Sequence, residues 1–295
     1  MSWRKLRLVA WFELAEALRS RLIIVVLAVY GAGAGVGALA FARALEAGER
    51  AARSSLEQMP GSPEVPPDVL RRQALPELLS HFIDDPELRA ELVRVDPLAL
   101  FYAFMSQELV APLVLVLAGG AHTSDLARGT ARFVLTRCDR LSWALGKLLG
   151  HAALLALGLW VGALVTAGVG LSEGAFDLPS LAWLLRASLR TWVYGLAHLG
   201  IFVGVALAAR VPARARTLSV LTLIGLWLGH SLCTTEWFLE RVPPARLLAW
   251  CFPGQYARLR WSATLSLSVG ASLALLCIGA VAFGAGHALF RRRDA

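Results

Sequence analysis

Six long apolar windows constrain this chain of 295 residues more than any other feature of its sequence. Five of them contain no Asp, Glu, Lys or Arg, and the sixth is interrupted only by Glu108. An apolar helix needs roughly 20 residues to cross about 30 Å of hydrocarbon, and each window reaches that length. The mean hydropathy of +0.60 agrees with this interpretation. The windows are 22–42, 97–124, 148–172, 191–209, 217–235 and 261–290.

The chain is therefore predicted to be an all-α membrane protein with six transmembrane helices. A soluble helical protein would show one apolar face per helix, whereas the stretch LLALGLWVGALVTAGVGL is apolar on all sides. A cleaved signal peptide is not expected, because the first window is too long and Glu13 and Glu16 precede it. The expected spans are about 22–43, 97–121, 147–171, 184–209, 217–235 and 263–290, within a membrane domain that covers 22–295.

Basic residues predict how these spans are oriented, since Lys and Arg are enriched on the cytoplasmic side. They cluster before residue 22, in 122–146, in 210–216 and in 291–293, whereas the segment 44–96 is mostly acidic. We therefore expect a protein of the bacterial inner membrane with both termini in the cytoplasm. Topology and anionic lipid headgroups explain the net charge of +8, so membrane lipid is an expected partner and nucleic acid is not.

Residues 1–21 are predicted to form an amphipathic helix that lies in the membrane interface. Glu13, Glu16 and Ser20 lie on the side opposite an apolar stripe. A water-exposed tail is the alternative, but it would leave two large aromatic side chains in water. The stripe consists of Leu8, Trp11, Phe12, Ala15, Leu18 and Leu22.

Two segments are expected outside the membrane. Residues 44–96 form a small helical outer domain, with helical pieces near 45–59, 68–80 and 84–96 separated by prolines. Recognition of a partner or cargo and packing over the outer mouth both remain open for it. Residues 236–260 fit short helices broken by turns at the interface, in a re-entrant-like segment.

Small and sulfur-containing residues give further expectations. The alternating glycines from Gly31 to Gly37 indicate close helix packing or local bending. A disulfide between Cys233 and Cys251 and two buried free thiols are both left open.

The sequence shows few residues in the patterns typical of catalytic or metal sites. A phosphate-binding loop around Lys147 fails, because Leu141 and Leu148 replace the first glycine and the Ser or Thr, so the chain is not itself expected to be an ATPase. The histidines show no metal-ligand spacing, and no metal site is expected. Gln107 and Glu108 form the most polar point within any span. They are candidates for a substrate pathway, with Glu108 facing either the bundle interior or a dimer interface.

The segment SDLARGTARFVLTRCDR, residues 124–140, has more structure than a simple connection needs. Thr123 or Ser124 with Asp125 can cap a helix start or fray the end of the second span. Gly129 permits a sharp turn, and 130–136 can form a short helix. The apolar residues 133–135 cannot all face one way, so part of this helix must contact something other than water. An ordinary loop with cytoplasmic arginines explains the charges but not these apolar residues.

This segment resembles the signature of the type-2 ABC transporter permeases, the ABC-2 type transmembrane subunits. The family pattern has an acidic residue, Gly-Thr, an apolar patch, Pro, Arg and then Gly-Lys entering the third span. Asp125 stands where Glu is usual, Cys138 where Pro is usual, and Arg140 comes about one residue early. The matching residues here are Asp125, Gly129, Thr130, Phe133 to Leu135, Arg140, Gly146 and Lys147.

The resemblance implies a permease subunit of an ATP-driven exporter, which pairs with a second permease and with ATP-binding subunits that hold ATP and Mg. Residues 122–146 would be the coupling segment that docks on the ATPase, and 210–216 a smaller second contact. A membrane scaffold or assembly factor that binds another cytoplasmic partner through 122–146 is the alternative, and the cargo stays open. The residues expected at the ATPase are Asp125, Arg128, Gly129, Thr130, Phe133, Leu135, Arg137, Arg140 and Arg214.

Overall fold

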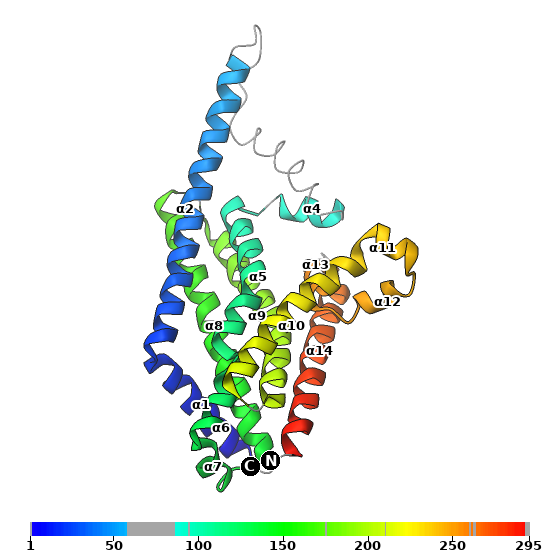
Figure 1. Cartoon of the computed structure of the whole chain (residues 1–295). Helices are drawn as coiled ribbons and strands as arrows, with labels where there is room; N and C mark the ends of the chain where they lie inside the picture. The colour runs from blue at the N-terminus through cyan, green and yellow to red at the C-terminus, as the bar shows by residue number, and fades with distance from the viewer. Residues whose placement is uncertain are drawn as a thin grey trace. The chain divides into compact units, whose positions relative to one another are not determined.

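The computed structural model describes residues 2–57, 86–93, 95–174, 176–209, 211–259, 261 and 264–292, and over these residues it is helical and contains no strand. Six of its helices are long and apolar enough to span a membrane, which confirms the expected number of spans (Figure 1). They are α2 (Arg21–Glu57), α5 (Pro97–Ala118), α8 (Arg140–Ser172), α9 (Leu178–Ala208), α10 (Pro212–Thr234) and α14 (Leu265–Arg291).

Shorter helices fill most of the remaining described sequence. Three of them occupy the segment 236–260, where short helices broken by turns were expected. All four cysteines are free thiols, so the disulfide between Cys233 and Cys251 is not formed, and buried Cys233 packs against Ala245 and Ala249. The short helices are α1 (Trp3–Arg19), α4 (Pro86–Leu92), α6 (Ala121–Arg128), α7 (Thr130–Leu135), α11 (Glu236–Arg241), α12 (Ala245–Ala249) and α13 (Pro253–Leu259).

Some helix boundaries differ from those expected. Helix α2 continues without a break to Glu57, so the piece expected near 45–59 is an extension of the first span. The sequence explains this, because residues 42–57 are rich in Ala, Glu and Arg and contain no proline. The piece expected at 68–80 lies outside the described residues.

Helices α8 and α9 begin earlier than hydropathy predicted, because an aspartate caps each start. The carboxylate of Asp139 accepts hydrogen bonds from the backbone N–H of Ser142 at 2.9 Å and from its hydroxyl at 2.7 Å. Asp177 accepts from the backbone N–H of Ser180 at 2.8 Å. These bonds satisfy N–H groups that have no partner within the helix, and they hold the pKa of both carboxyls below the usual range.

The chain divides into two compact units. Unit 1 comprises Met1–Leu27, Ser106–Leu159 and Ser188–Ala295, and unit 2 comprises Ala28–Met105 and Trp160–Ala187. The core of unit 2 contains Ala99, Tyr102, Ala163, Ala167 and Leu184.

Glycines of α2 account for part of the packing in unit 2. A Cβ added at Gly31 or Gly35 would lie 3.1 or 2.8 Å from a valine side chain of α8. Glycine therefore allows close helix packing at these two positions, as the sequence indicated. Gly33 faces open space, so it does not share that role.

In unit 1, α9 and α14 cross with their backbones in direct contact. A Cβ on Gly200 would collide with the backbone of Gly279, and one on Gly204 would collide with the backbone of Ala282. A Cβ on Gly286 would likewise strike the backbone of Gly204. Lipid tails are as apolar as these side chains, so the two helices associate through close packing rather than through a hydrophobic driving force.

Gly204→Ala is expected to destabilise unit 1 by about 1–3 kcal/mol, because the added methyl group must push two helix backbones apart. Gly284→Ala is the matched control, since a Cβ there meets nothing within 4 Å. The measurement is the thermal unfolding of the purified chain in detergent. Equal melting temperatures for the two variants would contradict the close crossing.

Candidate functional site

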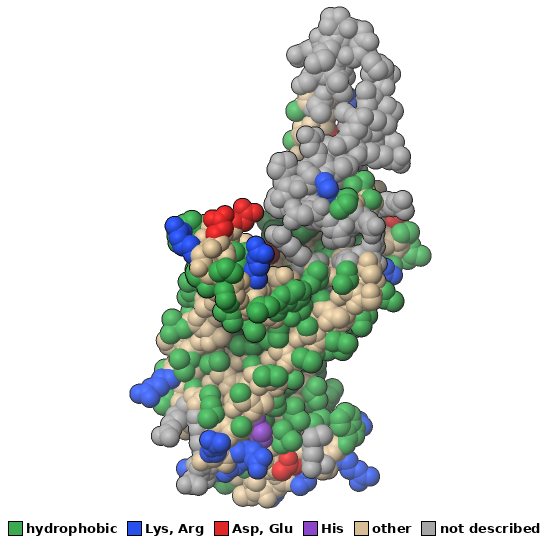
Figure 2. Space-filling model, turned by 90° about the vertical axis from the view of Figure 1, so that its right-hand side faces the viewer, with side chains coloured by type: hydrophobic (Ala, Val, Ile, Leu, Met, Phe, Trp, Pro, Cys, Tyr) green, Lys and Arg blue, Asp and Glu red, His purple; other side chains and the backbone are tan. Residues whose placement is uncertain are grey.

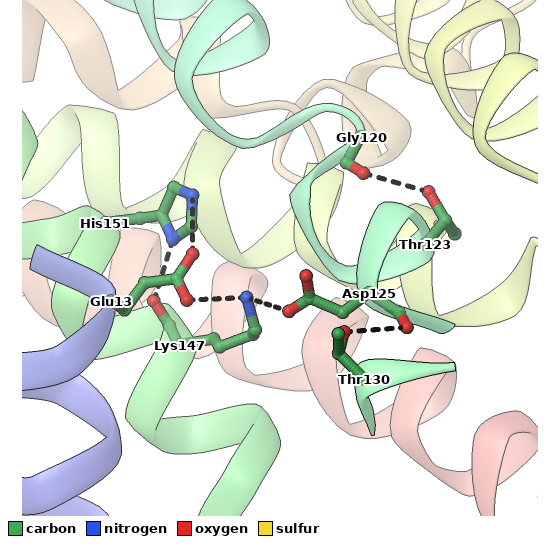
Figure 3. A network of polar contacts seen from close by, with 7 residues as sticks. All are labelled: Glu13, Gly120, Thr123, Asp125, Thr130, Lys147 and His151. Carbon is green, nitrogen blue, oxygen red and sulfur yellow. Dashed lines mark hydrogen bonds and ion pairs between the residues drawn. The ribbon is translucent and has the colours of Figure 1, made fainter. Parts of the chain in front are cut away.

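A buried lysine joins three helices of unit 1. Lys147 of α8 is 4% exposed, and its ammonium donates a hydrogen bond to Glu13 of α1 at 2.5 Å. The same ammonium lies 2.6 Å from a carboxylate oxygen of Asp125 in α6 (Figure 3). A buried charge is costly unless it is paired and hydrogen-bonded, and two carboxylates meet that requirement here. We call Glu13, Asp125, Lys147 and His151 the ion cluster.

His151 lies one helical turn beyond Lys147 and extends the cluster. Its Nδ1–H donates to the carbonyl oxygen of Lys147 at 2.9 Å, and its Nε2 lies 3.7 Å from a carboxylate oxygen of Glu13. The ring of His122 from α6 stacks on that of His151 with centroids 6.1 Å apart, and meets Trp143 edge-on. The rings and the ion cluster together form one buried contact among α1, α6 and α8.

Two glycines on either side of Lys147 allow α1 to approach α8. A Cβ on Gly146 would lie 2.6 Å from Cβ of Val9, and one on Gly150 would lie 2.8 Å from Cβ of Glu13. Small residues spaced four apart form a shallow groove along one helix face, which lets a second helix come close. Gly146 and Lys147 are part of the motif identified in the sequence. The structure shows that Gly146 and Gly150 allow α1 to come close enough for Glu13 to reach Lys147.

The two sides of α1 differ sharply. Leu8, Trp11 and Phe12 are 70%, 70% and 65% exposed, whereas the Glu13 side chain is only 12% exposed. The apolar stripe expected from the sequence therefore faces away from the protein. The sequence does not indicate a partner for Glu13, and the structure shows that Lys147 is its partner.

Helices α6 and α7 form a helical hairpin, residues 121–135, that follows the end of α5. Gly129 adopts a left-handed conformation with φ of 75°, and the hydroxyl of Thr130 donates to the carbonyl oxygen of Asp125 at 3.1 Å across the turn. The expected turn at Gly129 and short helix after it are thus confirmed. Of the two alternatives for Thr123, Ser124 and Asp125, the side-chain cap is wrong, because α6 begins at Ala121 and the Thr123 hydroxyl bonds back to the carbonyl oxygen of Gly120 within the first turn.

The residues expected at a partner ATPase fall into two groups. Phe133 is 79% exposed, Leu135 and Gly129 are half-buried, and the remaining exposed members are Arg128, Thr130, Arg137 and Arg214. Asp125 instead bonds to Lys147, and Arg140 donates to the carbonyl oxygens of Phe290 and Arg291 at 3.4 and 3.0 Å. A cation there also complements the negative end of α14.

Figure 2 shows Lys and Arg side chains gathered at the lower end of the face it presents, below a stretch covered mainly by hydrophobic side chains. Arg210, expected in the second contact, lies outside the described residues.

Gln107 and Glu108 point to different sides of α5. The indole N–H of Trp261 donates to the side-chain oxygen of Gln107 at 2.7 Å, and the guanidinium of Arg190 lies 5.4 Å from the centre of the Trp261 ring. Glu108 is exposed, so it does not face the interior of this chain. Sequence reasoning missed Arg190 and Trp261, although Arg190 stands immediately before a charge-free window.

The helices and the hairpin define a multi-pass membrane protein with a helical hairpin between its second and third spans. Residues 7–295 match the family described as ABC-2 family transporter protein, and the chain belongs to this family. It is therefore a membrane permease subunit of an ABC transporter, in a family whose membrane subunits lack an ATPase domain of their own. Membership also implies partnership with an ABC ATPase subunit. No curated protein sequence matches the chain.

Lys147→Met is expected to destabilise unit 1 by about 2–4 kcal/mol, below the full cost of breaking a buried pair, because it leaves the partly buried carboxylates of Glu13 and Asp125 without their cation. Lys5→Met is the matched control, since Lys5 is the other lysine of the chain and is exposed. Thermal unfolding and size-exclusion profiles in a zwitterionic detergent measure the effect. If the two variants unfold at the same temperature, the ion cluster does not hold the three helices together.

Proposed function

We propose that this chain is the permease subunit of an ATP-driven exporter, and that the α6–α7 hairpin is the segment through which a separate ATPase moves the membrane helices. It resides in the bacterial inner membrane with both termini in the cytoplasm. ATP and Mg belong to the partner subunit. The observation that carries the proposal is the hairpin itself, whose second helix, α7, exposes an aromatic ring while its first helix, α6, is bonded to a membrane-spanning helix.

The exposed surface of the hairpin has the composition of a protein contact. Phe133 projects with 79% of its surface free, and Arg128, Arg132 and Arg137 are exposed around it. Aromatic residues and arginines are the side chains that most often dominate binding energy at protein interfaces. A purely water-facing loop gains nothing from an exposed phenylalanine, whereas a groove on the ATPase would bury it.

Asp125 of α6 and Arg140 at the start of α8 connect the hairpin region to the spanning helices in this proposal. Asp125 connects α6 to α8 through Lys147, and Arg140 connects the start of α8 to the end of α14. A displacement of the hairpin by the ATPase is therefore passed to two spanning helices. Closure of the ATPase then favours one orientation of the spans over another, to the extent that it binds the two states with different affinity.

The assembled transporter contains two permease copies in this proposal, and Glu108 lies at their interface. Its side chain makes no hydrogen bond or ion pair with any residue in the part of the chain that the structure describes. A carboxylate within a span is costly in lipid and usually faces protein or water. Leu109 and Val116, 49% and 54% exposed on the same helix, continue this face.

The double variant Phe133→Asp with Arg137→Glu tests the ATPase contact. Removing one hydrophobic and one charged contact is expected to weaken binding of the cognate ABC ATPase by at least thirtyfold, the effect of about 2 kcal/mol at a hot spot. Co-purification and permease-stimulated ATP hydrolysis are the measurements. Arg291→Glu with Arg292→Glu serves as the control, because both residues are exposed at the end of α14. Unchanged binding and hydrolysis in the hairpin variant would show that the hairpin is not the coupling segment.

Cysteine crosslinking in membranes tests the second permease copy. In a chain whose four native cysteines are replaced by alanine, Leu109→Cys is expected to form a crosslinked dimer because it belongs to the exposed side of α5 that also carries Glu108. Leu221→Cys on α10 is the control, at a similar exposure of 57%. Equal crosslinking at the two positions, or none at Leu109→Cys, would remove this face of α5 from the interface.

A further inference from the structure

Helix α1 carries cations and apolar side chains on the same exposed side. Arg4, Lys5, Arg7 and Arg19 are all exposed. Arg4 and Lys5 precede Leu8 by four and three residues, and Arg7 precedes Trp11 by four, so each cation lies one helical turn from a residue of the apolar stripe. Glu16 is the exposed carboxylate of this helix, whereas Glu13 is bonded to Lys147.

This interleaving fits an anionic bilayer surface better than a protein or nucleic acid. Leu8, Trp11 and Phe12 can enter the boundary between headgroups and acyl chains while the long basic side chains reach back to the phosphates. Attraction between basic residues and anionic lipids strengthens such binding. A nucleic-acid surface would use the cations but leave the three apolar side chains in water.

The opposite side of α1 is held by the ion cluster. Leu6 is 3% exposed, and Val9, Ala10 and Glu13 lie against Gly146 and Gly150 of α8. Glycines contribute little side-chain packing, so the contacts of Glu13 with Lys147 and His151 are the polar connections that fix α1 along this groove. The same ammonium holds Asp125 of α6.

We propose that α1 is a binding surface for anionic phospholipid, and that Lys147 transmits its occupancy to the α6–α7 hairpin. A bilayer rich in anionic headgroups holds α1 in the position in which Glu13 reaches Lys147. The shared ammonium then holds Asp125, and with it helix α6 of the hairpin, in place. The regulatory meaning rests on the proposed function of the hairpin, but the lipid response is a property of this chain alone.

The experiment measures amide hydrogen exchange of the full chain in lipid nanodiscs of two compositions, phosphatidylcholine alone and phosphatidylcholine with 30% phosphatidylglycerol. The anionic discs are expected to slow exchange in α1 by about fivefold for each cation that contacts the surface. Exchange in α6 is expected to slow with it, by at least threefold. Wild-type exchange that is the same in both kinds of disc would overturn the proposal.

Two sets of variants separate lipid binding from its transmission. Arg4→Gln with Lys5→Gln is expected to reduce the lipid effect in both α1 and α6, and Arg291→Gln with Arg292→Gln, which removes the same charge elsewhere, to leave both intact. Lys147→Met is expected to keep the effect in α1 and abolish it in α6. The mechanism would be contradicted if anionic lipid slowed exchange in α6 of Lys147→Met as much as in the wild type. It would also be contradicted if the Arg4→Gln, Lys5→Gln pair and the Arg291→Gln, Arg292→Gln pair lost the lipid effect equally.

A further variant keeps the test informative if Lys147→Met does not fold. The triple change Glu13→Gln, Asp125→Asn and Lys147→Met removes the ammonium and both carboxylates of the cluster together and leaves neither carboxylate without its cation, which is less destabilising than removing one partner. It is expected to retain the α1 response and lose the α6 response. The hydrogen-exchange experiments use this chain without the ATPase. The lipid response can therefore be absent while the hairpin is still the coupling segment, and it can be present even if the hairpin does not bind the ATPase.

Discussion

One buried ammonium shared by two carboxylates determines how the helices of unit 1 are joined. Lys147 is almost fully removed from solvent, and its charge is balanced by groups from α1 and α6. An ion cannot be left unpaired in such a place without a cost of several kcal/mol. Any rearrangement of this region must therefore move the three helices together or exchange one carboxylate for another partner, which restricts the motions that the hairpin can transmit.

The glycine contacts between helices constrain the sliding of one helix along another less than the ion cluster does. At the crossing of α9 and α14 the backbones meet directly, and in the groove between α1 and α8 the side chains of Val9 and Glu13 lie against glycines. Such contacts are close but contain few side-chain features that fix one helix along the other. The groove on α8 allows α1 to come close, and the bond between Glu13 and Lys147 fixes the position of α1 along α8. Small residues and buried charges thus have complementary roles in the same unit.

The six spans were predictable because a bilayer requires long, contiguous apolar windows, which are a local property of sequence. The ion cluster was not, since Glu13 and Lys147 are 134 positions apart and no spacing rule connects them. The early starts of α8 and α9 were missed for another reason: Asp139 and Asp177 act as caps through hydrogen bonds that hydropathy does not register.

Gln107 and Glu108 show why adjacency in sequence is a poor guide to a shared site on a helix. Neighbouring residues on an α-helix point about 100° apart, so a polar pair is divided between two faces. Gln107 accepts a hydrogen bond from Trp261 inside unit 1, whereas Glu108 lies on the exposed face. A change at Gln107 therefore perturbs the contact between α5 and the segment before α14. A change at Glu108 acts on whatever covers α5 in the assembled transporter, so the two residues report on separate events.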